Sequence, residues 1–142
     1  MWARSIGEKP KKQIEGNMAS INKALDKLEE VVLMHTKDWD GQGVEAPNEK
    51  AINNTKLVIS ELIESDLQPD IGACVDGGLC VSFYHNKRYG DVECSNEGEI
   101  LAVTSTEAKD TKVWEVEEKE IRETLDKINE YCKRKNDYVV NS

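Results

Sequence analysis

Residues 71 to 106 alternate apolar and polar side chains, and three short turn-forming segments interrupt the alternation. A period of two is typical of β-strands that bury one face. The alternation predicts four strands, at residues 71–75, 79–84, 89–94 and 100–106. Parallel strands need long crossover connections, and these segments are too short for that, so we expect an antiparallel meander.

The turn sequences predict how the strands pair. We place a three-residue loop at 76–78, a two-residue turn at 86–87 and a turn at 96–97. The predicted opposite pairs are Val75 with Leu79, Cys74 with Cys80, Tyr84 with Tyr89, Val81 with Val92, Val92 with Leu101, and Gly90 with Val103.

This register predicts two chemically different faces of the sheet. The expected core face carries Ile71, Ala73, Val75, Leu79, Val81, Phe83, Val92, Cys94, Leu101 and Val103. The opposite face is expected to carry Cys74, Cys80, Ser82, Tyr84, Tyr89, Asp91, Glu93, Ala102 and Thr104. The second face is thus predicted to be polar, acidic and aromatic.

Helical periodicity flanks the strand region. A first helix is predicted from Asn17 to about His35, and we expect His35 to contact free carbonyl groups at its end. A second helix begins after an N-cap at Asn48 and ends near residue 65. A short fifth strand at 112–116 leads into a last helix. The apolar stripe of the first helix is Met18, Ile21, Leu25, Leu28, Val32 and His35, and that of the last helix is Ile121, Leu125, Ile128 and Cys132. A run of glutamates opens the last helix, where negative charge suits the helix dipole.

The predicted fold class is therefore α+β, with two N-terminal helices, a four- to five-stranded antiparallel meander sheet and a C-terminal helix. A length of 142 residues is typical of one domain. We expect a flexible arm at residues 1–16, a single domain at 17–135 and a tail at 136–142.

The net charge of -9 argues against direct binding of nucleic acid and favours a basic protein partner. Apolar runs are too short for a membrane span, and residues 1–16 lack the apolar segment of a secretory signal, so we expect a cytoplasmic protein. Reduced thiols are then expected at all the cysteines: Cys74, Cys80, Cys94 and Cys132.

The sequence predicts neither a metal nor a cofactor. The cysteines lack the paired spacing of zinc ligands, and His35 and His85 fall in separate segments. Neither a dinucleotide-binding glycine motif, a P-loop nor a zincin motif is present. We therefore expect a protein that is not an enzyme.

The segment from Asp38 to Pro47 interrupts the helical pattern with Trp39-Asp40-Gly41-Gln42-Gly43 and then Ala46-Pro47. We expect a turn in which the indole ring packs inward and the glycines allow a sharp bend. With the downstream helix, Pro69 and an Asp-Gly hairpin, this segment resembles a family of small bacterial and prophage proteins that share a Trp-Asp-Gly-Tyr-Gly-Ala loop. Gln42 and Val44 depart from that pattern. The resemblance implies a helix-helix-sheet fold and an origin in a mobile element, and it supplies no catalytic residue.

Taken together, these features predict a partner-binding patch on the polar sheet face, with tyrosines supplying contact area and carboxylates supplying electrostatic attraction. The candidate residues are Tyr84, Tyr89, Asp91, Glu93, Glu97 and Glu99. The hypothesis is a non-catalytic acidic inhibitor or immunity-type protein, similar to anti-CRISPR proteins or antitoxins, that occludes a basic nucleic-acid-binding surface on a nuclease, toxin or CRISPR effector.

Two alternatives stay open at this point. One is a small enzyme that uses Cys74 or Cys80 with His85. The other is a homodimeric adaptor without a foreign partner.

Overall fold

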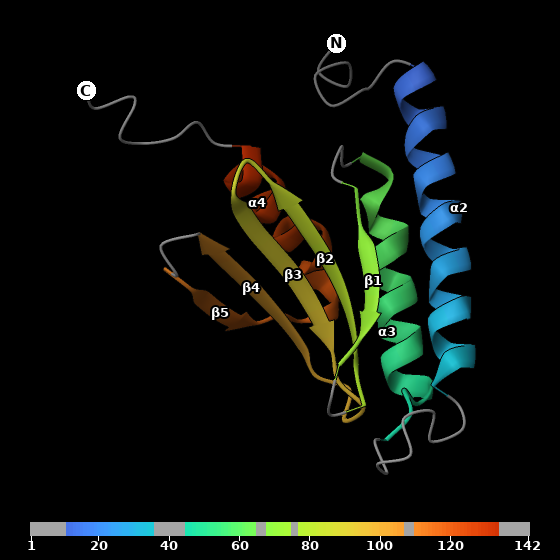
Figure 1. The fold of residues 1–142 in the computed structure, drawn as a ribbon. Coiled ribbons are helices and arrows are strands. Elements are labelled where there is room, and N and C mark those ends of the chain that lie inside the picture. The colour runs from blue at the N-terminus through green and yellow to red at the C-terminus, as the bar shows by residue number, and fades with distance from the viewer. Residues whose placement is uncertain (1–10, 36–44, 65–67, 75–76, 107–109, 134–142) are drawn as a thin grey trace.

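The structure, a computed structural model, describes residues 11–35, 45–64, 68–74, 77–106 and 110–133 (Figure 1). In chain order the elements are α2 (Lys11–Met34), α3 (Glu49–Ser60), the 3-10 turn η1 (Glu61–Glu64), β1 (Asp70–Ala73), β2 (Leu79–His85), β3 (Arg88–Cys94), β4 (Ile100–Thr106), β5 (Lys112–Glu115), the 3-10 turn η2 (Glu118–Glu120) and α4 (Ile121–Lys133). The predicted α+β class is confirmed, as are the two N-terminal helices, the antiparallel meander with its fifth strand, and the C-terminal helix.

The five strands form one sheet in the order β1-β2-β3-β4-β5, with every neighbouring pair antiparallel. In Figure 1, α4 lies behind the strands, while α3 and then α2 lie beyond the β1 edge. Helix α3 contacts β2 and β3, α4 contacts β2, β3 and β4, and α2 contacts α3, β1 and η1. The helices therefore pack on one face and one edge of the sheet, and we call the other face the open face.

The β2–β3 hairpin has the predicted register. Asn86 and Lys87 both have positive φ, at 51° and 65°, as the two central residues of a type I′ turn require. Tyr84 therefore lies opposite Tyr89, and Val81 lies opposite Val92.

The predicted register of β3 with β4 is wrong by one residue. Val92 lies opposite Ala102, not Leu101, and Gly90 lies opposite Thr104, not Val103. The connection is a three-residue loop of Asn96, Glu97 and Gly98, closed by a bond of 2.9 Å from the Ser95 N–H to the Glu99 carbonyl. Gly98 has a φ of 96°, a conformation that closes three-residue hairpins and adds one residue to the expected turn.

Because side chains alternate along a strand, this shift exchanges the two faces of β4. Ile100, Ala102 and Thr104 are buried on the helix-covered face. Leu101 and Val103, predicted for the core, lie half-buried on the open face instead.

The predicted register of β1 with β2 is also wrong, by two residues. Cys80 lies opposite Gly72, not Cys74. The Cys74 N–H donates to the Gly78 carbonyl at 2.8 Å, so the loop comes earlier than predicted. A shift of two preserves the faces, and Ile71 and Ala73 still point toward the core, whereas Val75 lies outside the described residues.

Helix α2 begins at Lys11, so residues 11–16 are helical and not part of an arm as predicted. The buried face of α2 differs from the predicted apolar stripe. Ala24 and Val31, which were not in that stripe, are buried, whereas Met18, which was, is 51% exposed. The end of the helix matches the prediction, since Nδ1 of His35 lies 2.7 Å from the Val31 carbonyl oxygen. The predicted arm at 1–10, the tail at 136–142 and the Trp39 segment lie outside the described residues.

Helices α3 and α4 begin with the predicted signals. The side chain of Asn48 accepts a bond of 3.1 Å from the Ala51 N–H and so caps α3. Ahead of α4, Glu120 accepts a bond of 2.9 Å from the Glu117 N–H, which gives the glutamate run a capping role. The predicted stripe of α4 is buried as expected: Ile121, Leu125, Ile128 and Cys132.

Gly90, at the centre of β3, sets how closely α4 approaches the sheet. A Cβ atom at this position would lie 2.6 Å from Cγ2 of Ile128. Phe83 lies opposite Gly90 on the same face and is buried. The absence of a side chain at Gly90 therefore makes room for Ile128 beside the Phe83 ring.

We expect Gly90→Ala to lower the free energy of unfolding by about 1–3 kcal/mol, because the new methyl group overpacks against α4. The measurement is urea unfolding followed by circular dichroism. Gly72→Ala is the matched control, since a Cβ there meets no atom within 4 Å. Equal stability of the two variants would contradict the assigned contact between β3 and α4.

Candidate functional site

The open face is defined by the strand residues that alternate with the core residues. They are Asp70, Gly72, Cys80, Ser82, Tyr84, Tyr89, Asp91, Glu93, Leu101, Val103, Ser105, Val113 and Glu115. None of the described helices crosses this face, which is turned toward the viewer in Figure 1.

Charges are segregated between the two faces of the sheet. The acidic residues of the described strands, Asp70, Asp91, Glu93 and Glu115, all belong to the open face. The basic residues of the same strands, Arg88 and Lys112, belong to the helix-covered face.

Contacts with α4 hold these basic residues on the covered side. The guanidinium of Arg88 donates to the Tyr131 carbonyl at 3.3 Å, and its central carbon lies 5.0 Å from the centroid of the Tyr131 ring. Lys112 lines a hollow beside the same tyrosine. The open face of the described strands therefore carries acidic side chains, of which Asp70 and Glu115 are exposed, and no basic ones.

Asp91 is the most unusual residue of this face, because it is only 4% exposed although no helix covers it. The Tyr89 hydroxyl donates a bond of 2.6 Å to Oδ2 of Asp91. Oδ1 of Asp91 is buried and has no hydrogen-bond partner. Burial raises the pKa of Asp91, and the bond from Tyr89 only partly offsets this effect.

Cys80 and Tyr89 belong to the same cluster. Burial, and then the nearby Asp91 carboxylate, raise the pKa of the Cys80 thiol. Burial and the bond to Asp91 likewise raise the pKa of Tyr89. Both groups therefore stay protonated at neutral pH, and the Tyr89 hydroxyl donates to the Asp91 carboxylate.

The pairing of Cys80 with His85, one of the two forms of the cysteine-enzyme alternative, is not formed in β2. Cys80 and His85 are five residues apart in β2, so their side chains lie on opposite faces. Burial also raises the pKa of Cys94 to about 11 and raises the pKa of Cys132. These thiols lack the low pKa that an attacking thiolate needs.

The structure brings together four of the six predicted site residues. Tyr84, Tyr89, Asp91 and Glu93 share the open face of β2 and β3. Glu97 and Glu99 lie apart from them, in and beside the turn that follows β3.

That turn is held against the start of α3 by a buried polar side chain. Asn96 accepts from the Asn48 N–H at 2.8 Å through Oδ1 and donates to Oε1 of Glu45 at 2.8 Å through Nδ2. These hydrogen bonds fix the turn that carries Glu97 and Glu99 at the start of α3. The two glutamates therefore do not join the other predicted site residues.

The sequence prediction missed an aliphatic component of the site. Leu101, Val103 and Val113 continue the open face across β4 and β5. A Gly at the third position of the β3–β4 turn was the signal that could have revealed it, because a three-residue loop turns Leu101 and Val103 outward.

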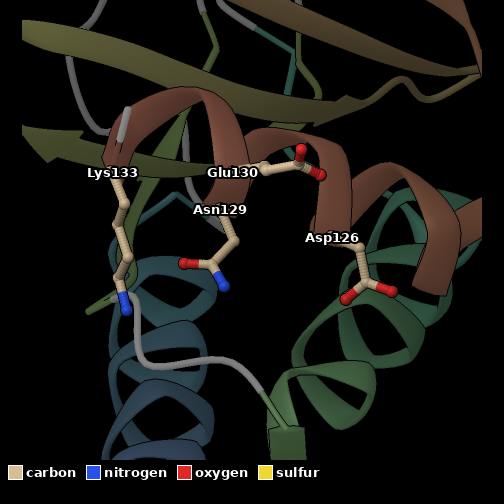
Figure 2. Close-up of a pocket in the computed structure, with 4 residues that line it drawn as sticks. All are labelled: Asp126, Asn129, Glu130 and Lys133. Atoms are coloured by element: carbon tan, nitrogen blue, oxygen red, sulfur yellow. The ribbon is translucent and has the colours of Figure 1, made fainter. Parts of the chain in front are cut away.

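Two further hollows are lined by described residues of the helices. Figure 2 shows the first, about 570 Å³ in volume and lined by Asp126, Asn129, Glu130 and Lys133, all on α4. The second is an apolar groove of about 600 Å³ between α2 and α3. Neither contains a cysteine or histidine among its described lining residues, so neither provides a nucleophile next to a base.

Within the described segments, the side chains form no cluster of three or more metal-ligating groups. In those same segments no helix is both long and apolar enough to cross a membrane. Comparisons with protein-family models, with curated proteins and with solved structures find no match to this chain.

We expect the stability of the protein to depend on pH through Asp91. The raised pKa means that the folded state binds the Asp91 proton more tightly than the unfolded chain does. Lowering the pH from neutral toward the ordinary aspartate range of about 4 therefore favours the folded state at this residue. Relative to Asp91→Asn, the wild-type protein should gain free energy of unfolding as the pH falls, measured by urea unfolding at several pH values.

Asp70→Asn is the control, because Asp70 is exposed on the same face. The difference from wild type should change more with pH for Asp91→Asn than for Asp70→Asn. A difference that is independent of pH for Asp91→Asn would contradict the assigned burial of the Asp91 carboxylate.

Proposed function

We propose that this protein is a non-catalytic, acidic binding protein whose open sheet face docks onto a basic surface of another protein. The observation that carries the proposal is the charge segregation: every acidic residue of the described strands lies on the open face and both basic ones on the covered face. Complementary potentials of this kind speed association and select the partner.

The open face also has the apolar component that a stable interface needs. Tyr84 on β2 is 67% exposed, and Val113 on β5 is 59% exposed. Leu101 and Val103, on β4, are half-buried. Aromatic and aliphatic groups beside charges match the make-up of protein interfaces.

The partner class we propose is a nucleic-acid-binding protein, such as a nuclease, a toxin or a CRISPR effector. Its phosphate-binding groove would present lysine and arginine side chains, and the carboxylates of the open face would compete with phosphate for them. The protein would then serve as an inhibitor or immunity-type protein of a mobile element, acting in the cytoplasm. It would not bind nucleic acid itself.

The test compares two variants of equal charge. Glu93→Lys with Glu115→Lys reverses the open face, and Glu15→Lys with Glu30→Lys changes exposed positions on α2. Each substitution of glutamate by lysine raises the net charge by two, so both double variants have a net charge of -5 in place of -9. Tagged proteins are incubated with lysate of the natural host, and retained proteins are identified by mass spectrometry at about 50 mM and about 300 mM salt.

We expect a basic nucleic-acid-binding protein to be retained by wild type and by the α2 variant at low salt, and to be reduced about tenfold or more by the open-face variant. Capture that is equal for both variants would sink the assignment of the open face. Recovery of this chain alone would favour the homodimer.

A further inference from the structure

We propose that the Asp91 carboxylate, with Glu93 beside it, is a receptor for the guanidinium group of an arginine of the partner, and that the Tyr89 hydroxyl occupies this receptor until the arginine binds. This inference rests on the proposed function, because it names the group that the open face recognises.

The first argument is the incomplete hydrogen bonding of Asp91. Its side chain is 4% exposed, and Oδ2 accepts the bond from Tyr89 while Oδ1 is buried without a partner. A buried carboxylate normally has its oxygens satisfied, and leaving one unpaired costs free energy. A site that tolerates this cost before binding recovers it when a donor arrives.

The second argument is that the described strands place no basic side chain on the face that carries Asp91. Among the described strand residues, Arg88 and Lys112 are the basic ones, and both lie on the far face of the sheet. Ser82 and Val103 lie directly opposite Asp91 on this face, and the titratable groups that act on it are Tyr89, Cys80 and Glu93. None of these side chains is basic. The described strands therefore supply no positive charge that would pair with the Asp91 carboxylate.

The third argument selects arginine over lysine. A guanidinium presents a planar fork of N–H groups that can bond both oxygens of one carboxylate, whereas an ammonium acts as a point charge. Oδ1 and Oδ2 of Asp91 would both be filled by such a fork. The ring of Tyr89 and that of Tyr84, which lies opposite it, offer faces on which a guanidinium stacks well.

Tyr89 is the group that must move. It is two residues from Asp91 in β3, points to the same face and is half-buried. Rotation about its Cα–Cβ bond would uncover the carboxylate without changing the backbone. In the free protein its hydroxyl holds the place of one arginine N–H group.

The experiment measures binding of an octa-arginine and an octa-lysine peptide by isothermal titration calorimetry at low salt, with the full chain. We expect wild type to bind octa-arginine roughly fivefold or more tighter than octa-lysine. Asp91→Asn should weaken octa-arginine binding about tenfold or more and abolish the preference, because it removes the negative charge and one of the two acceptor oxygens of the carboxylate. Glu115→Gln is the control with the same charge change at an exposed position of the same face, and it should keep the preference.

Tyr89→Phe gives a second, independent measurement if Asp91→Asn fails to fold. It retains the ring but removes the competing hydroxyl, so we expect octa-arginine to bind about threefold more tightly than to wild type. Unchanged or weaker binding would overturn the role of Tyr89 as the internal occupant.

The outcomes separate this inference from the proposed function. Equal loss for Asp91→Asn and Glu115→Gln, without an arginine preference, overturns the receptor but leaves an acidic docking face. If the Glu93→Lys, Glu115→Lys variant still captures the host partner, the docking face itself is wrong, whatever the peptides show.

Discussion

The close contact between Gly90 in β3 and Ile128 in α4 lies on the covered side of the sheet. Ile128 occupies the space that a Cβ atom at Gly90 would need, so α4 packs closely over the central strand. Alternation along the strand then fixes the neighbouring residue: because Gly90 faces the helix, Asp91 must face the other way. The chemistry of the open face thus depends on a close approach made on the opposite side.

The energetic character of that open face is unusual for a sheet surface. A surface carboxylate is normally solvated, but Asp91 is enclosed, receives one bond from Tyr89 and has an unpaired second oxygen. The fold therefore accepts a locally unfavourable charge at the centre of a strand. Residues that weaken the free protein while they complement a ligand are typical of binding sites, and this is why the charge segregation and the unpaired oxygen support the same proposal.

The parts of the fold that the sequence predicted well are those governed by local rules. The turn at Asn86 and Lys87 has a two-residue geometry, and it placed Tyr84 opposite Tyr89 correctly. The N-cap at Asn48 and the buried apolar residues of α4 were also predicted correctly, because both depend on residues close together in the chain. The β3–β4 register failed because Gly98 lengthens the loop by one residue, and a one-residue error exchanges the faces of a whole strand.

The sequence by itself therefore determined the order of the elements, the meander and the presence of tyrosines and carboxylates on one face, since alternation, turn residues and caps act over a few neighbouring positions. Only the tertiary structure decided that Leu101 and Val103 join that face, that Arg88 contacts Tyr131 of α4 on the other side, and that Asp91 is buried. These outcomes depend on strand pairing and on helix packing between residues far apart in the chain, and burial of a charge is a property of those neighbours rather than of the residue that carries it.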